Sequence, residues 1–114
     1  WCDTAEVKFF RSPSGNISCE IDFRRGHGIT DGAHCMSVSP PQNVKMNSSG
    51  VLTAICTAGD SCLSNPPYGE PTLPYGHTTG LGSITCVSES SGVTCTVSSG
   101  RGFSISKSGI TPVG

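Results

Sequence analysis

Residues 16–24 read Asn-Ile-Ser-Cys-Glu-Ile-Asp-Phe-Arg, and their side chains alternate strictly between two kinds. The apolar set is Ile17, Cys19, Ile21 and Phe23, and the polar set is Ser18, Glu20, Asp22 and Arg24. Successive side chains of a β-strand point to opposite faces, so this alternation predicts a full-length strand with one buried face.

The same period recurs near the end of the chain. Alternating apolar residues are Val93, Cys95 and Val97, followed by Phe103 and Ile105. Turn-forming residues at 89–92 and 99–102 separate these runs, so residues 83–106 are predicted to form a three-stranded meander. Further strands are expected at 6–11, 34–38 and 51–57, and no window has helical periodicity. The predicted fold is all-β and antiparallel, a small sandwich or barrel-like meander with long loops, stapled by disulfides.

The chain carries seven cysteines in 114 residues, at positions 2, 19, 35, 56, 62, 86 and 95. Even spacing in a small Gly- and Ser-rich chain indicates a disulfide framework formed outside the cytoplasm. Because the number is odd, at least one thiol is free or bonded to another chain or ligand. We therefore expect a secreted or extracytoplasmic protein, free or anchored to a membrane or cell wall.

Hairpin geometry pairs four of these cysteines. Cys86 and Cys95 flank the turn at 89–92, and Cys19 and Cys35 lie on consecutive predicted strands. Cys56 is expected to form the third bridge, with either Cys62 or Cys2. No Cys-x-x-Cys or comparable ligand spacing is present, so no metal site is predicted.

Length and composition restrict the function classes. A chain of this size is expected to be one domain over residues 1–114, with a modest core. A net charge of −1 gives no basic stripe for nucleic acid. No run approaches the roughly 20 apolar residues of a spanning helix, so we expect no membrane insertion of this segment, and an anchor outside it remains compatible with the sequence. The chain opens on Trp1-Cys2, and we interpret it as the mature or trimmed form of an exported protein.

Residues 58–82 form a predicted Pro/Gly-rich loop in which Pro67-Tyr-Gly recurs as Pro74-Tyr-Gly. Proline donates no backbone hydrogen bond, so we expect no strand ladder across 65–76. Long loops in small domains are often functional. The loop is either a lid over the core or a recognition loop, and its candidate binding residues are Pro67, Tyr68, Tyr75 and His77, with Trp1 and Phe9 as possible apolar anchors.

The turn Ser-Pro-Ser-Gly-Asn at 12–16 is the most distinctive local motif. Pro13 restricts φ and Gly15 permits positive φ, which favours a structural corner. A ligand contact is the other interpretation of the same residues.

Several motifs together resemble a family of small secreted or membrane-anchored actinobacterial domains, including mycobacterial ones. The matching segments are Phe10-Arg-Ser-Pro-Ser-Gly-Asn-Ile-Ser-Cys19, Cys56-Thr-Ala-Gly-Asp60, Leu73-Pro-Tyr-Gly76, Cys86-Val-Ser88, Gly92-Val-Thr-Cys95 and Gly100-Arg-Gly-Phe103. They occur in the family's order and cover most of residues 10–107. The resemblance implies an exported cell-envelope domain and no particular activity.

The chain departs from that family pattern at three points. Arg101 stands where the family usually has histidine, and a cysteine usually found between the positions of Cys35 and Cys56 is missing. Cys2 and Cys62 are additional, which implies a different partner for Cys56.

No catalytic set is predicted. Ser104-Ile-Ser-Lys107 matches Ser-x-x-Lys, but it lies on an alternating strand without the companion motifs that this chemistry needs. We expect a non-catalytic envelope module that binds a protein or another envelope component, without a cofactor. The alternatives are a small hydrolase or wall-modifying enzyme that uses His27, His34 or His77, and a redox or tethering role for Cys2 or Cys62.

Overall fold

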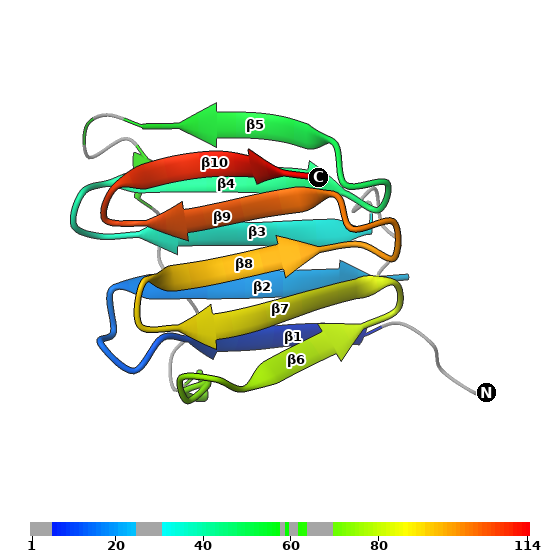
Figure 1. The fold of residues 1–114 in the computed structure, drawn as a ribbon, viewed down its shortest axis with the longest axis horizontal. Coiled ribbons are helices and arrows are strands. Elements are labelled where there is room, and N and C mark those ends of the chain that lie inside the picture. Colours follow the sequence, from blue (N-terminus) through cyan, green and yellow to red (C-terminus); the bar gives the residue numbers. More distant parts are fainter. Residues whose placement is uncertain (1–5, 25–30, 58, 60–61, 64–69) are drawn as a thin grey trace.

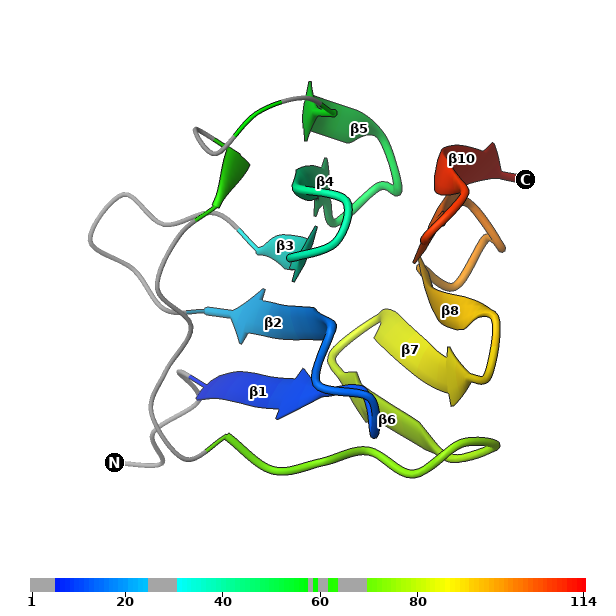
Figure 2. The same cartoon turned by 90° about the vertical axis from the view of Figure 1, so that its left-hand side faces the viewer.

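The alternating segments of the sequence form two antiparallel sheets that stack face to face (Figures 1 and 2). The computed structural model describes residues 6–24, 31–57, 59, 62–63 and 70–114. Within these residues each sheet is a five-stranded meander, in which every strand pairs with its neighbour in sequence. The predicted all-β antiparallel fold is confirmed, in its sandwich form.

The first sheet comprises β1 (Glu6–Arg11), β2 (Ile17–Phe23), β3 (Gly32–Ser37), β4 (Gln42–Asn47) and β5 (Leu52–Cys56). The second comprises β6 (Thr78–Leu81), β7 (Ile84–Glu89), β8 (Gly92–Thr96), β9 (Gly102–Ser106) and β10 (Gly109–Val113). Figure 1 shows the strands of both sheets in the same spatial order, with corresponding strands running in opposite directions.

The core lies between the sheets and contains the inward members of each alternating strand. Its largest fully buried side chains are Phe103, Ile21, Ile105, Val44 and Val93. Burying such side chains contributes about 1.5–3 kcal/mol each, which is the main favourable term in so small a domain.

Two disulfides occupy the centre of this core. Cys19 and Cys35 are directly opposite on β2 and β3, and Cys86 and Cys95 are directly opposite on β7 and β8. The two bridges touch across the sandwich, with 3.9 Å between the Sγ atoms of Cys35 and Cys95. The core is therefore centred on four sulfur atoms, two from each sheet.

The third bridge joins Cys56 to Cys62. Cys62 is one of the two partners expected for Cys56. The other, Cys2, lies outside the described residues. Three disulfides in a small domain are consistent with an oxidising compartment outside the cytoplasm.

The two sheets are related by an internal repeat that is also visible in the sequence. Gly15-Asn-Ile-Ser-Cys19 before and within β2 corresponds to Gly82-Ser-Ile-Thr-Cys86 before and within β7. Gly32 and Gly92 also occupy equivalent positions, because each lies three residues before a core cysteine. A Cβ atom at either would collide with a backbone carbonyl oxygen of the next strand. In each meander the disulfide therefore joins the second and third strands. The third strand also begins with a glycine that lies close to the backbone of the fourth strand.

Three strand predictions needed correction. Strands β4 and β10 were not predicted, and β6 lies inside the predicted loop 58–82. Residues 71–73 also form a short parallel bridge to Arg11, because Pro71 contributes its carbonyl oxygen and needs no N–H there.

Among the described residues, no helix is long and apolar enough to cross a membrane.

Candidate functional site

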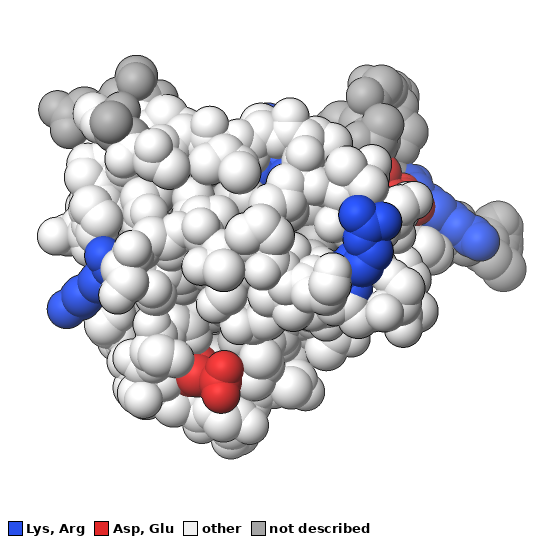
Figure 3. Space-filling model, turned by 45° about the horizontal axis from the view of Figure 1, so that its top comes forward, with Lys and Arg blue, Asp and Glu red and all other residues white. Residues whose placement is uncertain are grey.

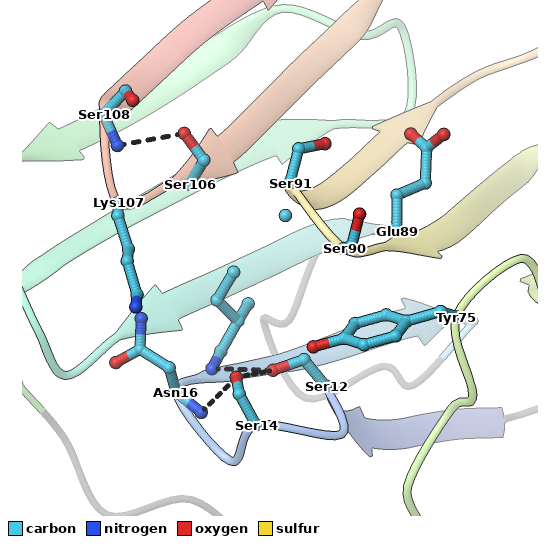
Figure 4. A pocket seen from close by; sticks show the side chains of 12 residues that line it. Ser12, Ser14, Asn16, Tyr75, Glu89, Ser90, Ser91, Ser106, Lys107 and Ser108 are labelled. Carbon is cyan, nitrogen blue, oxygen red and sulfur yellow. Dashed lines mark hydrogen bonds between the residues drawn. The ribbon is translucent and has the colours of Figure 1, made fainter.

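Three turns and one proline-rich segment converge at one end of the sandwich and enclose a cleft of about 340 Å³ (Figure 4). The turns are 12–16 between β1 and β2, 90–91 between β7 and β8, and 107–108 between β9 and β10. The segment before β6 contributes Tyr75. We call this space the serine cleft.

Hydroxyl groups dominate the described lining of the serine cleft. Its serines are Ser12, Ser14, Ser90, Ser91, Ser106 and Ser108. The other polar side chains are Asn16, Tyr75, Glu89 and Lys107. One carboxylate and one ammonium leave this lining with no net charge.

The turn 12–16 is fixed by its own hydroxyls and by the neighbouring loop. The buried Ser12 Oγ accepts a hydrogen bond from the Ile17 N–H (3.2 Å) and shares one with Ser14 Oγ (3.1 Å). The Asn16 side chain pairs with the Ser39 backbone, accepting from its N–H at 2.8 Å and donating to its carbonyl at 3.1 Å. The turn is therefore a structural corner, as predicted, and its Ser12, Ser14 and Asn16 also line the cleft.

Tyr75 is held at the cleft by hydrogen bonds on both sides of it in sequence. The Arg11 N–H donates to the Pro71 carbonyl, and the Leu73 N–H donates to the Arg11 carbonyl, both at 2.9 Å. After Tyr75, the Gly76 N–H donates to the Ser88 carbonyl at 2.7 Å. The segment thus connects β1 of one sheet to β7 of the other, and it leaves Tyr75 46% exposed.

Glu70 begins this connecting segment and packs on the outer side of β2. Its Oε1 accepts a hydrogen bond from Ser18 Oγ at 2.7 Å, while Oε2 is buried without a hydrogen-bond partner among the described residues. Burial raises the pKa of the Glu70 carboxyl, against the opposite effects of the Ser18 hydrogen bond and the Arg11 charge.

The described histidines lie outside the serine cleft. His34 projects from the outer side of β3, where burial and the Lys45 charge lower its pKa and the Asp22 charge opposes them. His77 is exposed two residues after Tyr75 and does not line the cleft. Neither imidazole is therefore joined with the cleft serines in an arrangement for nucleophilic catalysis.

Several predicted residues fall outside the described part of the chain: Trp1, Cys2, His27, Pro67 and Tyr68. In the described part, the Sγ atoms of Cys19, Cys35 and Cys95 lie within 4.8 Å of one another and form a group of potential metal ligands. All three are oxidised in disulfides, and the thiolate is the form that binds metal.

The outer face of the second sheet offers a different, flatter surface. One row across its five strands consists of Thr78, Val87, Thr94, Ser104 and Thr111. Figure 3 shows broad uncharged areas on this side of the molecule, with a few separated charged side chains. This face is polar through hydroxyls rather than through charges.

A second hollow of about 310 Å³ lies at the opposite end of the sandwich. Its described lining contains Val97 and five serines: Ser48, Ser49, Ser83, Ser98 and Ser99. It has neither an aromatic ring nor a charged group in that lining. It therefore provides a matched control for the serine cleft.

Sequence reasoning placed Tyr75 among the binding residues but missed the serines at 90–91 and 106–108, together with Glu89 and Lys107. The predicted meander could have identified these turns as neighbours, because alternate turns of a meander lie at the same end of a sheet. This pattern puts 90–91 and 107–108 together, but it does not say which turns of the other sheet face them.

No protein-family model, no curated protein and no solved structure matches the chain.

Proposed function

We propose that this protein is a non-catalytic, exported cell-envelope module that binds a protein or another envelope component through the serine cleft. The observation that carries the proposal is the cleft of about 340 Å³, with convergent polar groups and one half-exposed aromatic ring. Ligand sites are typically concave, of about 300–1,000 Å³, and combine a few placed polar groups with aromatic or apolar surface.

The cellular location is part of the same proposal. Three disulfides in a small domain support an extracytoplasmic location. The motif series of residues 10–107 supports a secreted or anchored envelope domain of the actinobacterial type. A protein bound to this module would meet it outside the cytoplasm.

Two features favour binding over catalysis. His34 and His77, the described histidines, stand away from the cleft serines, so neither of them is placed to act as the base for a hydroxyl nucleophile there. The turn 12–16 of the cleft is also fixed by hydrogen bonds, which limits the entropy lost there when a ligand binds.

The test compares capture of components from an actinobacterial envelope extract by immobilised wild-type protein and two variants. Tyr75→Ala removes the ring from the cleft, and Ile55→Ala removes a similarly exposed side chain (52%) from β5 as the control. We expect Tyr75→Ala to lose most of the retained material and Ile55→Ala to keep it, with both variants folded by circular dichroism. Equal retention by all three proteins would contradict the proposal.

A further inference from the structure

The chemistry of the serine cleft restricts the class of ligand that it can take. A serine hydroxyl can donate one hydrogen bond and accept two, and an amide such as that of Asn16 does both. The described lining contains six serines, so its hydrogen-bonding groups are mostly of this two-way kind. Groups of this kind complement a ligand whose own polar groups are hydroxyls.

Tyr75 adds a flat surface beside these hydroxyls. Figure 4 shows its ring at one side of the cleft, with the phenolic oxygen toward Ser12 and Ser14. The faces of an aromatic ring carry partial negative charge, which suits the polarised C–H groups on the flat face of a sugar ring. One side of such a ligand can then stack while its edges form hydrogen bonds.

Other ligand classes fit less well. A polyanion requires several cations, and Lys107 is the one Lys or Arg in the described lining. One common way to bind an extended peptide is to add it as a strand to a sheet edge. The cleft lies at the turn end of the sheets, and the neighbouring β1 backbone at Arg11 is already bonded to Pro71 and Leu73. A purely apolar ligand would displace water from the cleft hydroxyls and offer them no hydrogen bond in its place.

We propose that the serine cleft binds a neutral, polyhydroxylated ligand, a sugar unit of a glycan, with Tyr75 stacked on the sugar ring. This inference rests on the proposed binding function and names its ligand class. The volume of about 340 Å³ is near the lower limit for ligand sites, which suits one or two rings rather than a long segment. The bound unit is therefore a chain end or a short oligosaccharide.

The experiment is an NMR titration of the ¹⁵N-labelled chain with soluble oligosaccharides at millimolar concentration. The probes are cellotriose, chitotriose, mannotriose and galactobiose, with trialanine amide as the peptide control. We expect at least one sugar to shift the backbone amides of 14–16, 90–92 and 107–108, and trialanine amide to leave them unchanged. A pull-down with insoluble cellulose and chitin distinguishes a polymer chain end from a free oligosaccharide as the source of the sugar unit.

Two variants localise the binding. Tyr75→Ala should weaken the affinity about tenfold, the effect of losing one stacking contact. Ser99→Val, in the hollow at the opposite end, should leave the affinity unchanged. Shifts confined to that hollow, or to the row of Thr94 and Ser104 on the second sheet, would overturn the assignment of the site.

The two proposals fail in different ways. If all four sugars leave the cleft amides unchanged while Tyr75-dependent capture from envelope extract persists, the cleft binds another ligand class and the sugar proposal is wrong. If capture is also independent of Tyr75, the proposed binding function of the cleft is wrong as well.

Discussion

The disulfide between Cys86 and Cys95 should contribute more to the free energy of unfolding than closure of its short loop alone, because it also fills the centre of the core. Both residues are fully buried, and Cys95 touches Cys35 of the other sheet. The perturbation that tests this is Cys86→Ala/Cys95→Ala. It removes the cross-link and two core sulfur atoms together.

The expected loss has two parts. Closing a loop with a sequence separation of 9 contributes about 2.6 kcal/mol in the chain-entropy treatment. Each buried sulfur atom is comparable to a buried methylene group, so removing two adds about 1.5–2 kcal/mol in transfer and cavity terms. The total is about 4 kcal/mol, a large part of the 5–15 kcal/mol by which small domains are usually stable.

The bridge between Cys56 and Cys62 gives the comparison. Its sequence separation of 6 predicts about 2.2 kcal/mol from loop closure. Cys56 lies at the end of edge strand β5 and is only partly buried, whereas Cys62 is buried, so the cavity part is about half that of the core bridge. Cys56→Ala/Cys62→Ala should therefore cost about 3 kcal/mol, roughly three-quarters of the loss from removing the core bridge.

Urea unfolding followed by far-UV circular dichroism measures both losses. Cys86→Ala/Cys95→Val serves as a third variant, because the valine refills part of the space and should recover about 1 kcal/mol without restoring the cross-link. If the peripheral bridge costs as much as the core bridge, or if the valine recovers nothing, burial of the sulfur atoms does not govern their contribution.

Gly32→Ala and Gly92→Ala should each lower the free energy of unfolding by about 1–3 kcal/mol, since the added methyl group would meet a strand carbonyl, and an unchanged urea midpoint would refute this. Gln42→Ala should cost about 1–3 kcal/mol in the same assay, because the buried amide donates to the Ser106 carbonyl across the two sheets at 2.9 Å. For Glu70, burial raises the pKa in the folded state above its unfolded value. The stability it contributes is thus fully present below the unfolded pKa and is lost as pH rises through the folded pKa. Glu70→Gln should therefore lose less stability than wild type as the pH rises above the unfolded carboxyl pKa of about 4.3 in thermal unfolding, and identical pH profiles would show that ionisation of this carboxyl does not affect stability.

The strands that the sequence predicts are those whose pattern is complete within a few residues. Strand β2 and the meander from β7 to β9 alternate apolar and polar side chains, and this pattern needs no information from elsewhere in the chain. Strand β4 was missed because one of its inward positions is Gln42. That residue can be buried only because Ser37 and Ser106 accept hydrogen bonds from it.

Strands β6 and β10 were missed for a different reason. Strand β6 is short and follows a run of prolines, and β10 contains Pro112, which is acceptable because β10 is an edge strand. Edge status is a property of the assembled sheet. The repeat of Gly-x-Ile-Ser/Thr-Cys at 15–19 and 82–86, by contrast, was present in the sequence and would have indicated two equivalent halves.

By itself, the sequence determined the all-β class and the pairing of the two hairpin disulfides, because alternation and turn spacing act over neighbouring residues. Only the tertiary structure decided that Cys62 pairs with Cys56, that the two cystines meet in one core, and that Tyr75 lies beside the serines of three separate turns. These contacts join residues far apart in the chain. They exist only once the two sheets have packed face to face, because that packing determines which turns meet at each end.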